Sequence, residues 1–417
     1  MTTLRNVVTR SAAAIVDALE NARTQHQLGG LPMLAAPVVV PRQERTRLAR
    51  IAELLRTALL RLRGDDPWPG DVPRPPHFDD LLSSEPRNLP PLGACRFDAL
   101  YDPASGALSF VEVQAGDPSG APWVDGIVAA LSSVHVLEPW MKHADHLIPA
   151  HLRHVQRTYR EVWRGQDDPL VAFINEDGSF VRSDHELWAH LFRRHGVRAV
   201  CADPRAFTWD GAHAHLDGHT VDLVIRDSHD ELTISPGPDA TRPLRSALQA
   251  GLPRFNPFAD VWFDDKTCFV DLWHHADRFP AEERELIRRH IPRTERVTPD
   301  LTEYLRQHRE DWVLKPADGY GGFGIVVGRD VDDSRWSAAL EEALRKRTVA
   351  QFYVDVPRVA VARTRAHDVE WRDQHLTVSL WCHGGEFSGA YARAGDGKVV
   401  NVHQGGGIGP VVFTDEW

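Results

Sequence analysis

A glycine-rich segment between two apolar runs is the feature that most constrains this chain. Residues 312–327 read WVLKPADGYGGFGIVV, with Lys315 near the end of the first run and four glycines within six residues. Apolar runs on both sides of a glycine cluster predict two strands joined by a turn. Backbone that lacks Cβ atoms can approach a phosphate, and its N–H groups can bind an anion beside a lysine. The glycines are Gly319, Gly321, Gly322 and Gly324.

The glycines alone leave two interpretations open, an anion-binding loop and an ordinary hairpin with a flexible turn. Two common phosphate-binding motifs fit poorly, because both need a helix to begin directly after the glycines. Here an apolar run follows them instead. The surrounding motifs must therefore decide between the two interpretations.

The length and composition predict a globular protein of two or three lobes. The chain has 417 residues, of which 42% are hydrophobic and 26% charged. Its formal net charge of −11 disfavours nucleic acid or an anionic membrane as a partner. The four cysteines form no CxxC pair and no apolar window is long enough for a membrane span, so we expect a cytoplasmic protein. The sequence leaves open whether the chain forms a homo-oligomer.

A second signal lies near the front of the chain, where two predicted strands flank a turn at residues 102–106. Alternation places Arg96 and Asp98 on one face of the first strand, and Glu112 and Gln114 on one face of the second. Two carboxylates and an amide oxygen across a hairpin suit Mg²⁺, which leaves its other positions to phosphates and water. A surface hairpin with a cross-strand Arg–carboxylate pair is the alternative.

The rest of the sequence predicts a mixed fold with α+β and α/β parts. Residues 2–63 predict two helices with a break at Gly29-Gly30 and residues 37–41. Strands at 170–174, 197–201 and 220–225 with a helix at 183–195 predict a βαβ unit, which ends at Arg226. That arginine could bind a substrate carboxylate or lie at the edge of the core. Lys266 stands near a predicted helix start, where a bound anion would offset its unfavourable position.

The rear of the chain predicts helices followed by a series of strands. Four units are expected: an N-terminal helical segment and loop, a metal-binding hairpin with helices, an α/β lobe, and lobes that contain the glycine-rich segment and a C-terminal sheet. Their boundaries are 1–91, 92–165, 166–253 and 254–417. The expected helices are 123–137, 266–275, 281–291, 300–309 and 334–345, and the expected strands are 349–354, 356–365, 375–382, 386–393, 398–402 and 410–413.

The order of lysine, glycine hairpin, helix and apolar strand with Gln351 resembles the nucleotide-binding half of the ATP-grasp ligases. In that family a Glu-x-Asn metal motif usually follows the last strand, but no such motif occurs here after residue 357. Its nearest equivalent is Glu112-Val113-Gln114, and Arg96-Phe97-Asp98 precedes it. This order is similar to the circularly permuted ATP-grasp group, such as the synthetase domain of glutathionylspermidine synthase. Gln114 departs from the expected asparagine but keeps the amide oxygen.

The resemblance implies that residues 166–253 form a substrate-binding lobe and that residues 254–417 form ATP-binding lobes with a glycine-rich lid. It also implies a set of site residues. Asp98, Glu112 and Gln114 would bind Mg²⁺, Arg96 would orient the transferred phosphate, and Arg226 would serve the substrate lobe. Arg393 and residues 401–407 resemble the closing segment of the group. The implied ATP contacts are Lys266, Lys315, Gly319, Tyr320, Gly321, Gly322, Phe323, Gly324, Gln351, Tyr353 and Val354.

The function implied is an ATP-dependent carboxylate–amine ligase. Phosphoryl transfer from ATP would convert a carboxylate into an acyl phosphate, which an amine of a small amino-acid-like substrate then attacks to form a peptide or γ-glutamyl-type amide. A lid is needed because acyl phosphates hydrolyse readily. The alternatives are a small-molecule kinase that uses the same ATP site, a non-catalytic nucleotide-binding module and a scaffolding protein.

Overall fold

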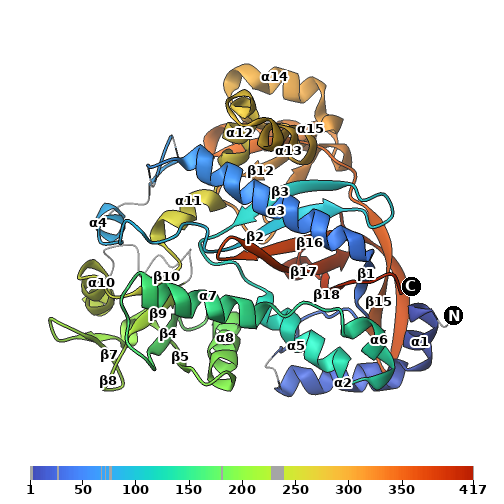
Figure 1. Ribbon diagram of the computed structural model, residues 1–417. Coiled ribbons are helices and arrows are strands. Elements are labelled where there is room, and N and C mark those ends of the chain that lie inside the picture. Colours follow the sequence, from blue (N-terminus) through green and yellow to red (C-terminus); the bar gives the residue numbers. More distant parts are fainter. Residues whose placement is uncertain are drawn as a thin grey trace.

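The computed structural model shows a large central sheet with helices on both faces and two smaller lobes beside it (Figure 1). Among the described residues, every helix is too short or too polar to span a bilayer. The structure describes residues 3–25, 28–66, 68–70, 72–74, 78–179, 182–226 and 239–416.

The central sheet joins the front of the chain to its rear. Its strand order is β1-β18-β17-β16-β2-β3, and β15 pairs with β16. The front hairpin β2–β3 pairs with β16, which places Ser379 directly opposite Asp98. Residues far apart in sequence are therefore neighbours in this sheet. Its strands are β1 (Val38–Val40), β2 (Ala94–Tyr101), β3 (Leu108–Gln114), β15 (Arg358–Arg365), β16 (Asp368–His383), β17 (Glu386–Gly395) and β18 (Gly407–Phe413).

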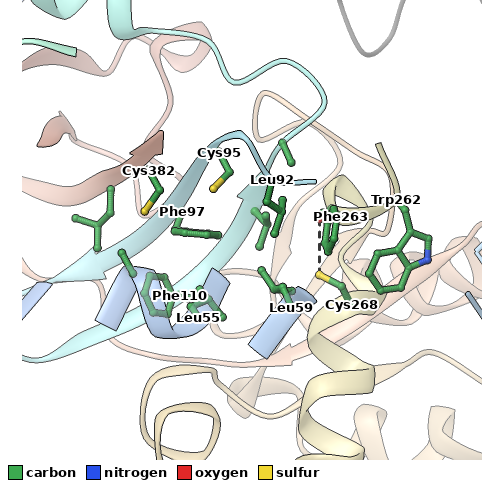
Figure 2. Packing of buried hydrophobic residues seen from close by; sticks show 14 of the residues in the cluster. Leu55, Leu59, Leu92, Cys95, Phe97, Phe110, Trp262, Phe263, Cys268 and Cys382 are labelled. Carbon is green, nitrogen blue, oxygen red and sulfur yellow. Dashed lines mark hydrogen bonds between the residues drawn. The ribbon is translucent and has the colours of Figure 1, made fainter. Parts of the chain in front are cut away.

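Alternation along the strands separates the two faces of this sheet. Phe97 and Val378 belong to the buried cluster that includes Leu55 of α3, and Figure 2 shows Phe97 and Leu55 in this packing. Trp381 belongs to a different cluster, with Ile127 of α5. The helices in contact with this sheet include α1 (Leu4–Arg10), α2 (Ala12–Gln25), α3 (Arg42–Arg63), α5 (Ala121–Ser132) and α7 (Leu147–Glu161).

The α/β lobe contains the predicted βαβ unit. Its parallel strands have the order β10-β9-β4-β5, and α8 packs against β4 and β5. The predicted strand at 220–225 divides into β8 and β9. The lobe consists of β4 (Leu170–Ile174), α8 (Arg182–Arg194), β5 (Arg198–Ala202), β9 (Leu223–Arg226), α10 (Arg242–Gln249) and β10 (Arg254–Phe255), with a small sheet of β6 (Thr208–Trp209), β7 (Ala214–Leu216) and β8 (His219–Thr220).

The third lobe carries the glycine segment. Its sheet has the order β11-β14-β12-β13, and β12 pairs antiparallel with β13, so the predicted glycine hairpin is confirmed. Trp312, Trp336 and Leu340 lie in the core of this lobe. Its elements are α12 (Thr267–His274), α13 (Ala281–His290), β11 (Thr294–Arg296), α14 (Pro299–Gln307), β12 (Trp312–Pro316), β13 (Val326–Val327), α15 (Asp333–Arg345) and β14 (Thr348–Phe352).

Some expectations about local structure were wrong. The first of the two helices expected in residues 2–63 is divided at Ser11 into α1 and α2, and the helix expected over 123–137 ends at Ser132. Residues 37–41 are not simply a break, because β1 lies there and pairs in parallel with β18. The expected strand at 398–402 is instead an irregular segment followed by a 3₁₀ turn at Val402–Gln404. The three valines of β1 favour a strand because β-branched residues fit a pleated sheet. The glycines at 405–407 favour a turn after residues 398–402.

Candidate active site

Two adjoining cavities lie where the front hairpin meets the glycine segment. The first is lined by Asp98, Lys315 and Gln351 among others, and the second, of about 410 Å³, by Arg96, Gln114 and other residues. The structure therefore brings together the front and rear motifs. Six residues line both cavities: Glu112, Gly319, Tyr320, Phe323, Arg393 and Asn401.

Lys266 joins the two motifs directly. Its Nζ lies 2.9 Å from Oε1 of Glu112 and also donates to the carbonyl oxygen of Gly319. The side chain is buried and directly precedes α12, and its backbone N–H donates to Ala317. A buried ammonium is held here by one carboxylate and one carbonyl, at the junction of the two cavities.

Lys315 is the second buried ammonium of the first cavity. It extends from β12 and donates to Oε1 of Gln351 on β14 across 2.6 Å. Burial, together with the nearby charge of Lys266, lowers the pKa of Lys315 to about 8, although Glu112 acts in the opposite direction. Among the described residues, no carboxylate lies at hydrogen-bond distance from Nζ of Lys315. A buried ammonium group without a carboxylate partner suits a site for an anionic ligand.

Asp98 sits at the centre of an arginine network. Both guanidinium nitrogens Nε and Nη2 of Arg96 donate to it at 2.9 Å, Arg393 lies 2.7 Å away, and the Ser379 hydroxyl donates at 2.7 Å. Burial opposes the charge on Asp98, but Arg393 and Arg96 outweigh burial and hold its pKa well below the usual range. Burial likewise opposes the charge on Arg96, and Asp98 reverses the effect, so the pKa of Arg96 is raised.

The predicted role of Asp98 as a metal ligand does not fit this geometry. Each of its oxygens already accepts two charged or hydroxyl donors, and two guanidinium groups would repel a divalent cation. Glu112 and Gln114, by contrast, line the second cavity. Within the described part of the chain, no group of three His, Cys, Asp or Glu side chains could hold a metal. One carboxylate and one amide oxygen fit Mg²⁺ only with ligands from a substrate and water.

The glycine segment covers both cavities. Gly319, Tyr320, Gly322 and Phe323 line the first, and Gly321 lines the second, whereas Gly324 lines neither. Tyr320 and Phe323 are 55% and 58% exposed, which is unusual for large aromatic side chains in a folded lobe.

The closing segment, residues 401–407, touches the glycine segment. Gln404 donates to the carbonyl of Gly322, and the His403 ring lies beside Phe323. Asn401 also lines both cavities. The sequence predicted this closing segment only through the family resemblance.

The end of β14 and the residues directly after it line the first cavity. Gln351 belongs to β14, and Tyr353 and Val354 follow this strand. The guanidinium of Arg329 lies 3.6 Å from the centre of the Tyr353 ring, and the backbone N–H of Tyr353 donates to Asp311. The Tyr353 ring is thereby fixed at the cavity wall.

Arg226 lies apart from the other predicted residues. It ends β9 and is fully buried, with its guanidinium 4.1 Å from the ring centre of Phe258, and it lines neither cavity. Residues 227–238, which follow it, lie outside the described residues. Contact between Arg226 and a substrate carboxylate stays a prediction.

Several cavity residues carried no recognised signal in the sequence. Asp117, Trp123 and Tyr391 line the second cavity, and Tyr391 donates to the carbonyl of Ser119. Asp117 lies in a segment that looked like an ordinary turn, AGDPSG. Its position directly after the Glu112–Gln114 strand was the available signal.

Comparisons with known proteins agree with this architecture, although no family model matches the chain. An ATP-grasp enzyme, ankG, from Aspergillus thermomutatus is 27% identical over 159 residues, which are 33% of this chain and 32% of that protein. The match thus spans about a third of that curated relative.

A solved structure covers nearly the whole chain. The apo form of a glutathione synthetase-like effector, GSS30, from Globodera pallida superposes with a TM-score of 0.60 over 96% of both chains, at 11% identity. At 11% identity, this similarity is evidence for the fold and not for the activity. With the glycine hairpin and the sheet described above, it identifies this chain as a protein of the ATP-grasp fold.

Proposed function

We propose that the chain is an ATP-dependent carboxylate–amine ligase that forms an amide between small amino-acid-like substrates and releases ADP and phosphate. The observation that carries the proposal is the position of Lys266. One ammonium contacts both the carboxylate of the front hairpin and the backbone of the glycine lid, where the two cavities adjoin. Such a junction is where a phosphoryl group would pass from one substrate to the other.

The first cavity is the proposed nucleotide site. Lys266 and Lys315 would neutralise phosphate charge, and the glycine backbone would donate its N–H groups without Cβ atoms in the way. Gln351, Tyr353 and Val354 would contact the base. The apolar wall, which includes Val327 and Val356, suits a flat aromatic ring.

The second cavity is the proposed site of the carboxylate and the amine. Arg96 and Arg393 reach it from β2 and β17, and Asp98 fixes both guanidinium groups. They would orient the carboxylate and stabilise charge as the phosphoryl group arrives. The lid would exclude water from the reactive acyl phosphate.

We propose that Glu112 and Gln114 hold Mg²⁺ with oxygens of the substrates and water. The ion would neutralise negative charge between phosphate oxygens. Glu112 contacts Lys266 at present, so the carboxylate would be shared between the two cations. This arrangement also supports a permuted motif order, since the metal-binding hairpin precedes the lid in sequence. Crystals soaked in ATP analogue and manganese would test it, because an anomalous peak away from Glu112 would contradict the assignment.

The activity is tested by ADP release. The chain is incubated with ATP, Mg²⁺ and pairs drawn from amino acids and polyamines, and products are identified by mass. ADP release that needs both an acid and an amine, with an amide product, would support the ligase. Release that needs one substrate and yields a phosphorylated product would indicate a kinase. No turnover with any pair, despite ATP binding, would indicate a binding module.

A further inference from the structure

Asp117 brings a carboxylate from the front segment to the wall of the second cavity. It lies in the loop between β3 and α5, and its side chain is 12% exposed. Its Oδ2 is 3.1 Å from Nε2 of His185, which belongs to α8 in the α/β lobe and is 1% exposed. A buried imidazole from a different lobe thus holds a carboxylate at the cavity.

The tautomer of His185 follows from its second partner. Its Nδ1 is 3.2 Å from Nδ2 of Asn175, directly after β4. An amide NH₂ group can only donate, so Nδ1 accepts and the ring proton lies on Nε2. Nε2–H then donates to Asp117. This donor stabilises the ionised carboxylate and fixes its orientation at the cavity wall.

Other charged or titratable groups lie in this region. Asp184 of α8 is almost fully buried, and the cavity that Asp117 lines is also lined by Arg96, Glu112, Asp264, Asp318, Arg393 and His403. Burial, together with the charge of Asp117, raises the pKa of Asp184 to about 7, although His185 acts in the opposite direction. Oδ1 of Asp184 has no hydrogen-bond partner among the described residues. Of these two neighbouring carboxyl groups, Asp117 is the one that reaches the cavity.

We propose that Asp117 binds the ammonium group of the acceptor substrate and takes its proton before attack on the acyl phosphate. This inference rests on the proposed ligase function. An ammonium has no lone pair and cannot attack, so a nearby proton acceptor is required. His185 and Asn175 are positioning residues that act through Asp117.

The proposed step balances as follows. The ammonium transfers one proton to the Asp117 carboxylate and becomes an amine. Its lone pair forms the C–N bond, the carbon–oxygen bond to the phosphate breaks, and phosphate leaves with that electron pair. The second nitrogen proton departs with the phosphate. Asp117 returns its proton to water when the products leave.

Hydroxylamine separates this step from the earlier ones, because it is a neutral nucleophile near pH 7 and needs no proton acceptor. The full-length protein is assayed with ATP, Mg²⁺ and a mixture of the twenty amino acids, with and without hydroxylamine. Hydroxamate reports formation of the acyl phosphate, and amide product reports attack by the natural amine. For Asp117→Asn we expect amide formation to fall about 100-fold, with hydroxamate formation within about twofold of wild type.

Asp210→Asn is the matched control. Asp210 also accepts from a histidine, with its Oδ2 2.9 Å from Nε2 of His215, but it lines neither of the two cavities. Both reactions should be unchanged in this variant. ATP affinity, measured by calorimetry, checks the fold of each variant, and Asp117→Ser provides a second test should Asp117→Asn be misfolded.

The role of His185 is tested by the pH profile. His185→Phe removes the hydrogen-bond donor to the Asp117 carboxylate, so the acidic limb of the pH–rate profile for amide formation should move to higher pH. His185→Gln keeps an N–H donor and should return the limb to its wild-type position. A general loss of rate with an unmoved limb would contradict a positioning role.

The remaining outcomes are distinct. Unchanged amide formation in Asp117→Asn would overturn the inference, and so would an equal loss of hydroxamate and amide. If the wild-type protein forms neither product with any acid, the proposed function itself fails and the inference falls with it.

Discussion

Arg393 on β17 reaches across β16 to Asp98 on β2, with 2.7 Å between its Nη2 and Oδ2 of the carboxylate. The hydroxyl of Ser379, on the intervening strand, donates to the same carboxylate. Three strands from both ends of the chain therefore converge on one buried charge. Asp98 holds the two arginines of the cavity in place and has no lone pair left for a metal ion.

Asp98→Asn should destabilise the protein by about 3 kcal/mol, because it leaves two buried guanidinium groups without their carboxylate. Urea unfolding at pH 7 measures the change. Asp373→Asn is the control, since Asp373 pairs with Arg358 in the same sheet but is 66% exposed, and a loss below about 1 kcal/mol is expected. Equal effects of the two substitutions would contradict the central role of Asp98.

The same carboxylate predicts how stability depends on pH. The pKa of Asp98 is lower in the folded than in the unfolded protein, so its contribution is present above about pH 4 and is lost as the pH falls further. Between neutral and acidic pH, wild type should lose more unfolding free energy than Asp98→Asn. Parallel curves for the two proteins would show that the network does not respond to acid as proposed.

ATP affinity should weaken as the pH rises, because the pKa of Lys315 is about 8 and phosphate binding favours the protonated form. The fall should approach about tenfold per pH unit well above that value. Calorimetric titration across this range measures it. Lys315→Met should bind ATP weakly and with a flatter pH dependence. Lys346→Met, at the exposed residue directly after α15, should match wild type.

Glu112→Gln should lower ADP release at least about 100-fold, since it removes the only carboxylate among the ligands that we propose for Mg²⁺. It also breaks the ion pair with Lys266. Assays over a magnesium series would show whether the metal requirement rises. Near-normal turnover at ordinary magnesium concentration would remove Glu112 from the site, and circular dichroism would verify the fold.

Gly324→Ala should weaken ATP binding through the lid. Gly324 has a φ of +73°, and an added Cβ would lie 2.8 Å from Cγ of Pro316. The backbone penalty alone is about 1 kcal/mol. Gly218→Ala is the control, because Gly218 has a φ of +79° and open space around its Cβ position. Both variants should lose stability, and only Gly324→Ala should lose ATP affinity; equal affinities would exclude a lid role for this glycine.

Local patterns in the sequence predicted most of the elements near the site. The glycine hairpin and the front hairpin depend on alternation and turn residues that lie within a few positions of each other, and both appear in the structure. The pairing of β2 with β16 has no such local signal and was not predicted. The order of motifs in a family indicated only that the front hairpin belongs to the same site as the glycine segment.

The role of Asp98 could not be read from the sequence for a physical reason. Alternation places it on the same face as Arg96, which suits a metal ligand and an ion pair equally well. The choice depends on Arg393 and Ser379, which are distant in sequence. Asp117 and His185 were missed because their contact joins two lobes.

The length of β16 ties the geometry of the proposed site to a single register. It pairs with β15 along its first half and with β2 along its second, and with β17 on its other edge. A slip by one residue would turn Ser379 to the opposite face and separate Arg393 from its anchor. We expect that partly folded chains do not bind ATP. During refolding, ATP binding and formation of the central sheet should therefore appear together.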